Sequence, residues 1–140
     1  MKKKDAVVLA VVGYILLFFY SEGWGADWRL FLNTTDEHFY YDAESITHPS
    51  EGIVRVWCKQ VYTEKGMSGM AGKLREEAKV SYWMDLAEFH CADRKFRLLS
   101  SVAYSTDGTR LHSIDEQEPK WGLISPESLL IDILYNILCK

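Results

Sequence analysis

The stretch IVRVWCKQVY, residues 53–62, decides the fold, because its side chains alternate in character along the chain. One set of alternate positions is largely apolar: Val54, Val56, Cys58 and Tyr62. The other set is charged or amphipathic: Arg55, Trp57 and Lys59. Such alternation is typical of an antiparallel strand with one buried face. The sequence therefore predicts a half-buried strand here, in which Cys58 lies among valines and acts as a small hydrophobic side chain.

Similar patterns occur on both sides of this strand. Further strands are expected at residues 28–32, 38–42, 81–91, 94–104 and 109–114. Residues 48–52 are expected to form a loop, because the proline and glycine there interrupt the flanking strands. Thr106-Asp107-Gly108 is a typical hairpin turn. Since the connections are short, sequence neighbours should pair, which predicts an antiparallel meander sheet of about six strands.

A glycine-rich stretch, TEKGMSGMAGKLREEAK at residues 63–79, lies where a phosphate-binding loop could occur. The required spacing is absent, because Met67 occupies the position of the first glycine and Leu74 that of the hydroxyl residue. Glycines in such a stretch normally belong to loops. We therefore expect a flexible connector.

The chain ends with SPESLLIDILYNILCK, residues 125–140, which predicts an apolar helix. Ser125 is a good N-cap, and Pro126 suits the first helical position. The apolar side chains of this helix span an arc of about 200°, so the helix should pack deeply on one face of the sheet. Cys139 falls outside that arc, and packing alone does not explain a cysteine there.

A disulfide bond from the helix to a strand would explain Cys139. Cys91 is the natural partner, because it ends the strand at 81–91, where the end of a helix could reach it. Cys58 is the alternative partner. Closing the chain loop of about 50 residues between Cys91 and Cys139 would stabilise the fold by ~4 kcal/mol on the chain-entropy model. The predicted fold class is therefore α+β, with a C-terminal helix tethered to the sheet.

The first 26 residues have the layout of a secretory signal peptide: three lysines, an apolar run at residues 6–20, and small residues. The alternative is an N-terminal anchor, although this run is shorter than the roughly 20 residues of a spanning helix. Residues 27–140 are then expected to form one exported domain that is not an integral membrane protein after cleavage. No cysteine lies immediately after the apolar run, where a lipid would be attached, so we do not expect a lipoprotein.

Composition and motifs argue against several functions. A formal net charge of −4 disfavours a nucleic-acid partner. No GxSxG motif marks a nucleophile, and Asp85 and Glu88, three residues apart on a strand, should face opposite ways. The four histidines are not spaced as metal ligands usually are; they are His38, His48, His90 and His112. We therefore expect no enzymatic activity, no metal site and no cofactor.

Several segments together resemble the bacterial surface-adhesin protein E family. They are WRLFL with FYYD, VRVWCKQVY, EFHCADRKFRLLS, and WGLISPES with the terminal cysteine. The resemblance covers nearly all of residues 27–140. It implies a sheet of about six antiparallel strands, a C-terminal helix across one face, and a disulfide between Cys91 and Cys139. It also implies binding of host proteins at a cell surface and a link to haem.

The leading hypothesis is an exported, non-enzymatic binding protein of the periplasm, the cell envelope or the cell surface, with an unidentified protein or envelope partner. Its contact residues would be Arg55, Trp57 and Lys59, because aromatic residues and arginine are common at interfaces. The alternative hypothesis is a periplasmic haem- or metal-binding carrier of the same fold.

Overall fold

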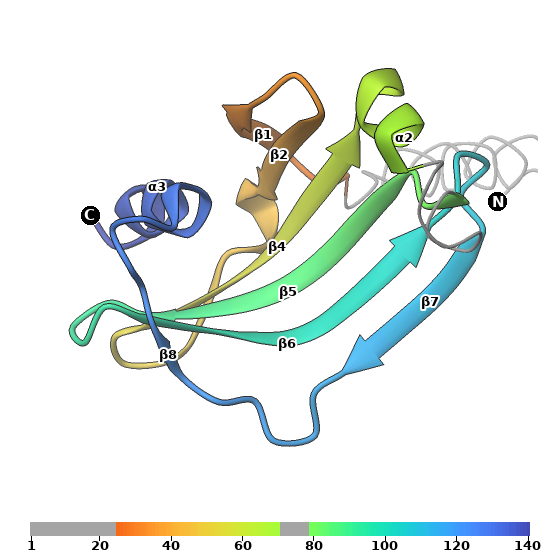
Figure 1. The fold of residues 1–140 in the computed structure, drawn as a ribbon. Coiled ribbons are helices and arrows are strands. Elements are labelled where there is room, and N and C mark those ends of the chain that lie inside the picture. Colours follow the sequence, from red (N-terminus) through yellow and green to blue (C-terminus); the bar gives the residue numbers. More distant parts are fainter. Residues whose placement is uncertain (1–24, 71–78) are drawn as a thin grey trace, which may run out of the picture.

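The structure is a computed structural model that describes residues 25–70 and 79–140. Most of the proposed signal segment therefore lies outside the described residues, as do Gly72 and Lys73 of the glycine-rich stretch. The described chain forms a curved antiparallel sheet with a helix across one face (Figure 1). No helix within the described ranges is long and apolar enough to cross a membrane.

The sheet is an antiparallel meander, as predicted. Its main strands are β1 (Trp28–Asn33), β2 (Glu37–Asp42), β4 (Ile53–Tyr62), β5 (Tyr82–His90), β6 (Lys95–Tyr104) and β7 (Arg110–Asp115). They lie in the order β1-β2-β4-β5-β6-β7. Two short strands extend this sheet: β3 (Thr47–Ser50) pairs with β4, and β8 (Gly122–Leu123) pairs with β6.

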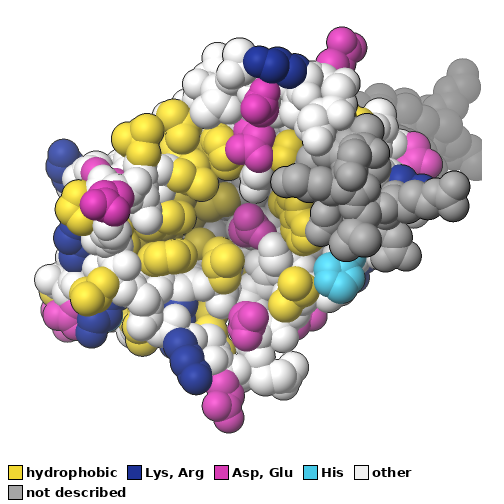
Figure 2. All heavy atoms as spheres, in the orientation of Figure 1, with side chains coloured by type: hydrophobic (Ala, Val, Ile, Leu, Met, Phe, Trp, Pro, Cys, Tyr) yellow, Lys and Arg dark blue, Asp and Glu magenta, His cyan; other side chains and the backbone are white. Residues whose placement is uncertain are grey.

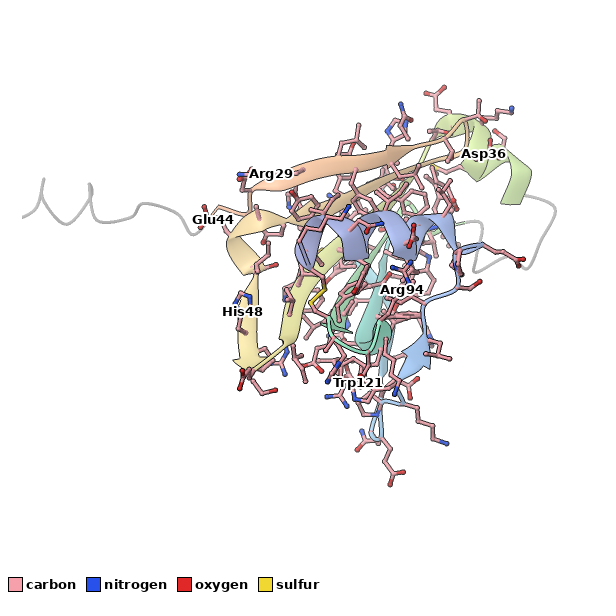
Figure 3. The ribbon with its side chains drawn as sticks, turned by 90° about the vertical axis from the view of Figure 1, so that its left-hand side faces the viewer. Arg29, Asp36, Glu44, His48, Arg94 and Trp121 are labelled. Carbon is pink, nitrogen blue, oxygen red and sulfur yellow. A yellow bond between two sulfur atoms is a disulfide. The ribbon has the colours of Figure 1, made fainter. Side chains whose placement is uncertain are left out.

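The apolar side of β4 and β5 forms the core with the C-terminal helix, α3 (Leu129–Leu138). Leu134 is the buried residue of α3, with 3% of its surface exposed. It belongs to a cluster with Val56, Ala87, Phe89 and Ile124. Figure 3 shows α3 lying across the sheet, between the β1–β2 hairpin and β8.

The predicted start of α3 is wrong. The helix begins at Leu129, with Ser128 in the N-cap position. Ser125 instead forms a turn, in which its carbonyl oxygen accepts from the amide of Ser128 at 3.0 Å and its hydroxyl oxygen accepts from the amide of Glu127 at 3.2 Å. Ile124 is only 4% exposed in the core just before this turn. The chain therefore has to leave the sheet and turn before the helix can begin.

The helix is also less deeply buried than its wide apolar arc predicts. Leu129 is 60% exposed and Ile137 is 41% exposed. Leu134, in contrast, faces the cluster on β4 and β5. Since α3 packs on the sheet along one side, the outer edge of its apolar arc remains in solvent.

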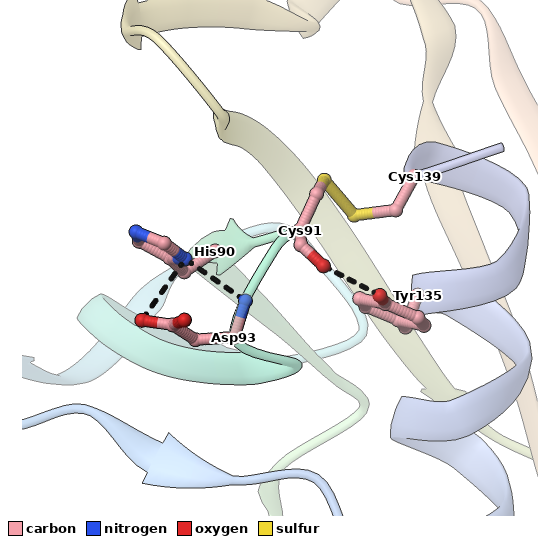
Figure 4. The surroundings of a disulfide bond; sticks show 5 residues. All are labelled: His90, Cys91, Asp93, Tyr135 and Cys139. Atoms are coloured by element: carbon pink, nitrogen blue, oxygen red, sulfur yellow. Dashed lines mark hydrogen bonds and ion pairs between the residues drawn. A yellow bond between two sulfur atoms is a disulfide. The ribbon is translucent and has the colours of Figure 1, made fainter.

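The predicted disulfide between Cys91 and Cys139 is present, with the two Cα atoms 5.4 Å apart (Figure 4). Cys139 follows the last helical residue as the C-cap. Its backbone, with φ of −105° and ψ of 11°, is not helical, so an ideal helical wheel does not give the direction of its side chain. The Tyr135 hydroxyl donates to the Cys91 carbonyl oxygen at 2.7 Å, beside the disulfide. The alternative partner, Cys58, is a free thiol. Burial raises the pKa of this thiol to about 12, and the charge of nearby Asp85 contributes to the shift.

The expected loop at residues 48–52 is partly a strand. β3 pairs with β4 at both of its ends, and the pairing is irregular at His48 and Pro49 between them. Proline lacks an N–H group, so it fits a short, exposed strand at the margin of a sheet better than a central one. Gly52, with φ of +73°, then makes the turn into β4.

The expected flexible connector begins with a helix, α2 (Glu64–Met70). The amide of Met67 donates to the carbonyl oxygen of Thr63 at 2.9 Å. Gly66 lies so close to the β1–β2 turn that a Cβ atom there would clash with the backbone carbonyl of Asp36. The glycine therefore serves a close approach of two segments.

Candidate functional site

The face of the sheet opposite α3 carries the side chains that the sequence singles out for contact. Val56 and Cys58 pack in or against the cluster beneath α3. Because neighbours along a strand point to opposite faces, the residues between and beside them lie on the other side. We call this surface the helix-free face. Its central residues are Arg55, Trp57, Lys59, Tyr82, Leu86, Glu88, Arg97 and Tyr104.

A buried carboxylate holds two arginines together on this face. Glu88 is 1% exposed and lies opposite Arg55 on β4 and Arg97 on β6. Arg55 donates to Glu88 Oε1 from Nε at 2.9 Å and from Nη2 at 2.7 Å. Arg97 binds Glu88 Oε2 through Nε and Nη2, each at 2.7 Å. The carboxylate is therefore clamped across three neighbouring strands.

The two arginines determine the ionisation of Glu88. Burial by itself raises the pKa of this carboxyl group. The hydrogen bonds from Arg55 and Arg97, together with their charges, act in the opposite direction and prevail, so that the pKa of Glu88 is lower than usual. Glu88 therefore stays charged at neutral pH, and the cluster carries two positive charges and one negative charge.

Aromatic rings surround these cations. Lys59 Nζ lies 4.5 Å from the ring centroid of Tyr82 and 5.8 Å from that of Trp28. Tyr82 stacks on Tyr104 with the ring centroids 4.9 Å apart. Arg97 lies over the Trp121 ring, with its Cζ atom 4.2 Å from the centroid. Contacts of this kind favour the cation and hold the rings in fixed positions.

A groove of about 880 Å³ opens on this face beside a short 3₁₀ helix, η1 (Ala43–Ser45). Trp57 and Leu86 are paired residues of β4 and β5 and form its base, and Arg55 lies next to Trp57. The remaining lining residues are Asp42, Glu44, Ser45 and Thr47, together with Gly25 and Ala26 at the end of the proposed signal segment. The lining of the groove thus includes the indole of Trp57, the guanidinium of Arg55 and the exposed carboxylate of Glu44.

Hydrogen bonds fix η1 against the groove. Asp42 is 8% exposed, and its Oδ1 atom accepts from the backbone amides of Asp27 at 2.9 Å and Glu44 at 3.0 Å. The Ser45 hydroxyl donates to the carbonyl oxygen of Asp42 at 2.8 Å and accepts from the amide of Trp57 at 2.9 Å. The groove is therefore preformed, which lowers the entropic cost of binding a partner.

The structure brings together two of the three predicted contact residues at the groove. Arg55 and Trp57 line it, whereas Lys59 lies two residues further along β4 and contacts aromatic rings instead. Sequence reasoning missed Glu88 and Arg97. The short turn between β5 and β6 was the available signal, because counting back from it on both strands places these two residues opposite each other.

The four histidines do not gather at one site. His48 lies on β3, His38 on β2 and His112 on β7, while the rings of His90 and Trp121 are nearly perpendicular with their centroids 5.7 Å apart. Within residues 25–70 and 79–140, no group of three or more His, Cys, Asp and Glu side chains is arranged to hold a metal ion.

A curved antiparallel meander with a disulfide-tethered C-terminal helix defines a particular class of α+β domain. The family model described as surface-adhesin protein E matches residues 28–140, and the chain belongs to that family. A similar solved structure is the crystal structure of protein E from non-typeable Haemophilus influenzae, with a TM-score of 0.52 and 16% sequence identity. The match covers 79% of this chain and 74% of that one, and it shows a shared fold. No curated protein matches the sequence significantly.

Proposed function

We propose that this protein is an exported, non-enzymatic binding protein of the cell envelope or cell surface that contacts a protein partner through its helix-free face. The observation that carries the proposal is the groove at Arg55 and Trp57, flanked by further cations and aromatic rings. Membership of the surface-adhesin protein E family supports a role in adhesion or binding.

The chemistry of the groove suits a polypeptide surface. Aromatic residues and arginine are enriched at protein interfaces, where an amphipathic ring gains contact area at a small entropic cost. Arg55 is already paired with Glu88, but its side chain remains 40% exposed. The guanidinium is therefore held in place while part of its surface stays available to a partner.

Site-specific photo-crosslinking in intact cells tests the proposal. A photoreactive residue replaces Trp57 in one strain and Leu129, which is 60% exposed on α3 on the other side of the sheet, in a second strain. We expect a discrete covalent adduct from position 57 and none from position 129, and mass spectrometry of the adduct identifies the partner. Adducts from position 129 alone would place the interface elsewhere.

Cell fractionation tests the proposed export. We expect the mature chain in the periplasm, on the outer surface or in the medium, with an N-terminus at residue 26 or 27. Recovery of full-length protein in the cytoplasm would contradict the proposal. The fraction that contains the protein also identifies where the crosslinked partner must be.

A further inference from the structure

A second, smaller cleft lies on the opposite side of the sheet, between α3 and the strands. Its volume is about 60 Å³. Most of its lining is apolar and includes Phe39, Phe89, Leu98, Leu130 and Ile131. Figure 2 shows hydrophobic side chains gathered around a hollow on this side of the molecule. α3 therefore covers the apolar face only in part.

One carboxylate lines this apolar cleft. Asp85 of β5 accepts a hydrogen bond from the hydroxyl of Ser101 on β6 through Oδ1. Within residues 25–70 and 79–140, no Lys, Arg or His forms an ion pair with it. Burial raises the pKa of this carboxyl group, an effect that the Ser101 hydrogen bond only partly offsets. Its charge is thus poorly compensated by the described residues.

The groups that face Asp85 from the neighbouring elements are neutral. Cys58 lies directly opposite on β4, and its pKa of about 12 keeps the thiol protonated. The backbone position of Lys59 borders the cleft, but its ammonium lies over the rings of Tyr82 and Trp28 on the other face. The α3 residues that line the cleft are leucines and isoleucine. The described residues of the cleft therefore supply a negative charge and no counter-ion.

We propose that this cleft binds a small primary alkylammonium ion, with the ammonium on the Asp85 carboxylate and the alkyl chain against the apolar lining. The Asp85 carboxylate lacks an ion-pair partner among the described residues and favours a cation, and the apolar walls favour a ligand whose remainder is hydrocarbon. A cavity needs about 10–15 Å³ for each water-sized group. The cleft, with a volume of about 60 Å³, therefore has room for about four or five heavy atoms. Butylammonium has that size.

The cleft is independent of the helix-free face. It lies between α3 and the sheet, whereas the groove at Trp57 lies on the opposite side. Either proposal can therefore fail while the other stands.

Titration of the purified, exported protein with butylamine, followed by ¹H–¹⁵N correlation spectra, tests the proposal. We expect saturable shifts at residues that line the cleft, including Leu98 and Ile131. Butan-1-ol should bind at least tenfold more weakly, because it lacks the charge, and butyrate should not bind. Equal affinities for the amine and the alcohol would overturn the proposal. Nα-acetyl-lysine amide should bind at least tenfold more weakly than butylamine, and equal binding would assign the cleft to lysine side chains of a partner instead.

Two matched variants isolate the role of the charge. Asp85→Asn keeps the shape of the side chain and should weaken butylamine binding at least tenfold, whereas Asp115→Asn should leave it unchanged. Asp115 is the control because it also accepts a serine hydroxyl, from Ser100 at 2.7 Å, but is exposed. Binding should also weaken as the pH falls and Asp85 takes up a proton. Unchanged binding to Asp85→Asn would overturn the proposal.

Discussion

Asp85 and Glu88 lie three residues apart on β5, and their carboxyl groups occupy opposite faces of the sheet with pKa values shifted in opposite directions. Asp85 lies on the α3 side, where burial raises its pKa. Glu88 lies on the helix-free face, where Arg55 and Arg97 lower its pKa against the effect of burial. The charge of Asp85 therefore destabilises the fold, and the charge of Glu88 stabilises it.

Asp85→Asn is expected to raise the free energy of unfolding at neutral pH. The native pKa of Asp85 is above its unfolded value, so the native wild type carries an energetic penalty while the carboxylate is charged. This penalty falls as the pH falls through the raised native pKa, and it is gone below the ordinary pKa of 3.8. Urea unfolding at several pH values should show the advantage of the variant shrinking on acidification. A variant that is less stable than wild type at pH 7 would contradict this.

Glu88→Gln is expected to lower the free energy of unfolding by about 3 kcal/mol, because removing one charge from a buried ion pair leaves its partners uncompensated. The native pKa is below the ordinary value of 4.5, so the stabilisation is present above that pH and is lost as the pH falls through the native pKa. Urea unfolding at pH 7 measures the effect. The exposed Glu118→Gln is the control and should change little.

Replacing Cys91 and Cys139 together by serine is expected to cost ~4 kcal/mol, since 48 residues separate the two cysteines and the unfolded chain gains the freedom that the disulfide removes. Denaturant unfolding of the oxidised wild type and the double variant measures the difference. Tyr135→Phe removes only the hydrogen bond to the Cys91 carbonyl and should cost about 1 kcal/mol. Equal stability of the double variant and wild type would show that the tether does not stabilise the native state.

Gly66→Ala and Gly69→Ala are expected to have opposite effects, although both glycines lie in α2. A Cβ atom at position 66 would clash with the carbonyl oxygen of Asp36, so this variant should be destabilised by at least about 1 kcal/mol. Position 69 has open space, and alanine there should stabilise the protein by up to about 1 kcal/mol through its higher helix propensity. Thermal unfolding of both variants tests the pair, and two destabilised variants would contradict the open space at position 69.

The central strands could be predicted from the sequence because their pattern is strong. The alternation at residues 53–62 gives β4 with its observed bounds. Asp85 and Glu88 face opposite ways as predicted, since the direction of a side chain follows directly from its position along a strand. The pairing of Cys91 with Cys139 could also be predicted, because Cys91 ends a long strand and Cys139 ends the helix that crosses it.

The elements that the sequence did not reveal depend on contacts between distant segments. Pro49 argues against a strand locally, but pairing with β4 stabilises β3. Gly66 argues against a helix locally, but α2 requires a glycine where it meets Asp36. The start of α3 depends on where Ile124 is buried. Local propensity does not contain this information, and tertiary contacts override it.

The candidate site, like the fold, was predictable only where it depends on a local sequence pattern. The pattern of β4 places Arg55, Trp57 and Lys59 on one face. The clamp at Glu88 required the registers of two strand pairs, and the groove required the position of η1 beside Trp57. Sequence patterns thus identify the face, and the fold determines what that face can bind.

The most direct test of the central claim is the equilibrium affinity of the crosslinked partner for purified Trp57→Ala compared with Leu129→Ala, a variant at an exposed position of α3. Truncating a buried anchor of an interface costs at least about 1.4 kcal/mol, which corresponds to a tenfold change in Kd. We predict that Trp57→Ala binds at least tenfold more weakly than wild type and that Leu129→Ala binds within twofold of it. Wild-type affinity of Trp57→Ala, with its fold intact, would contradict the claim that the helix-free face is the binding surface.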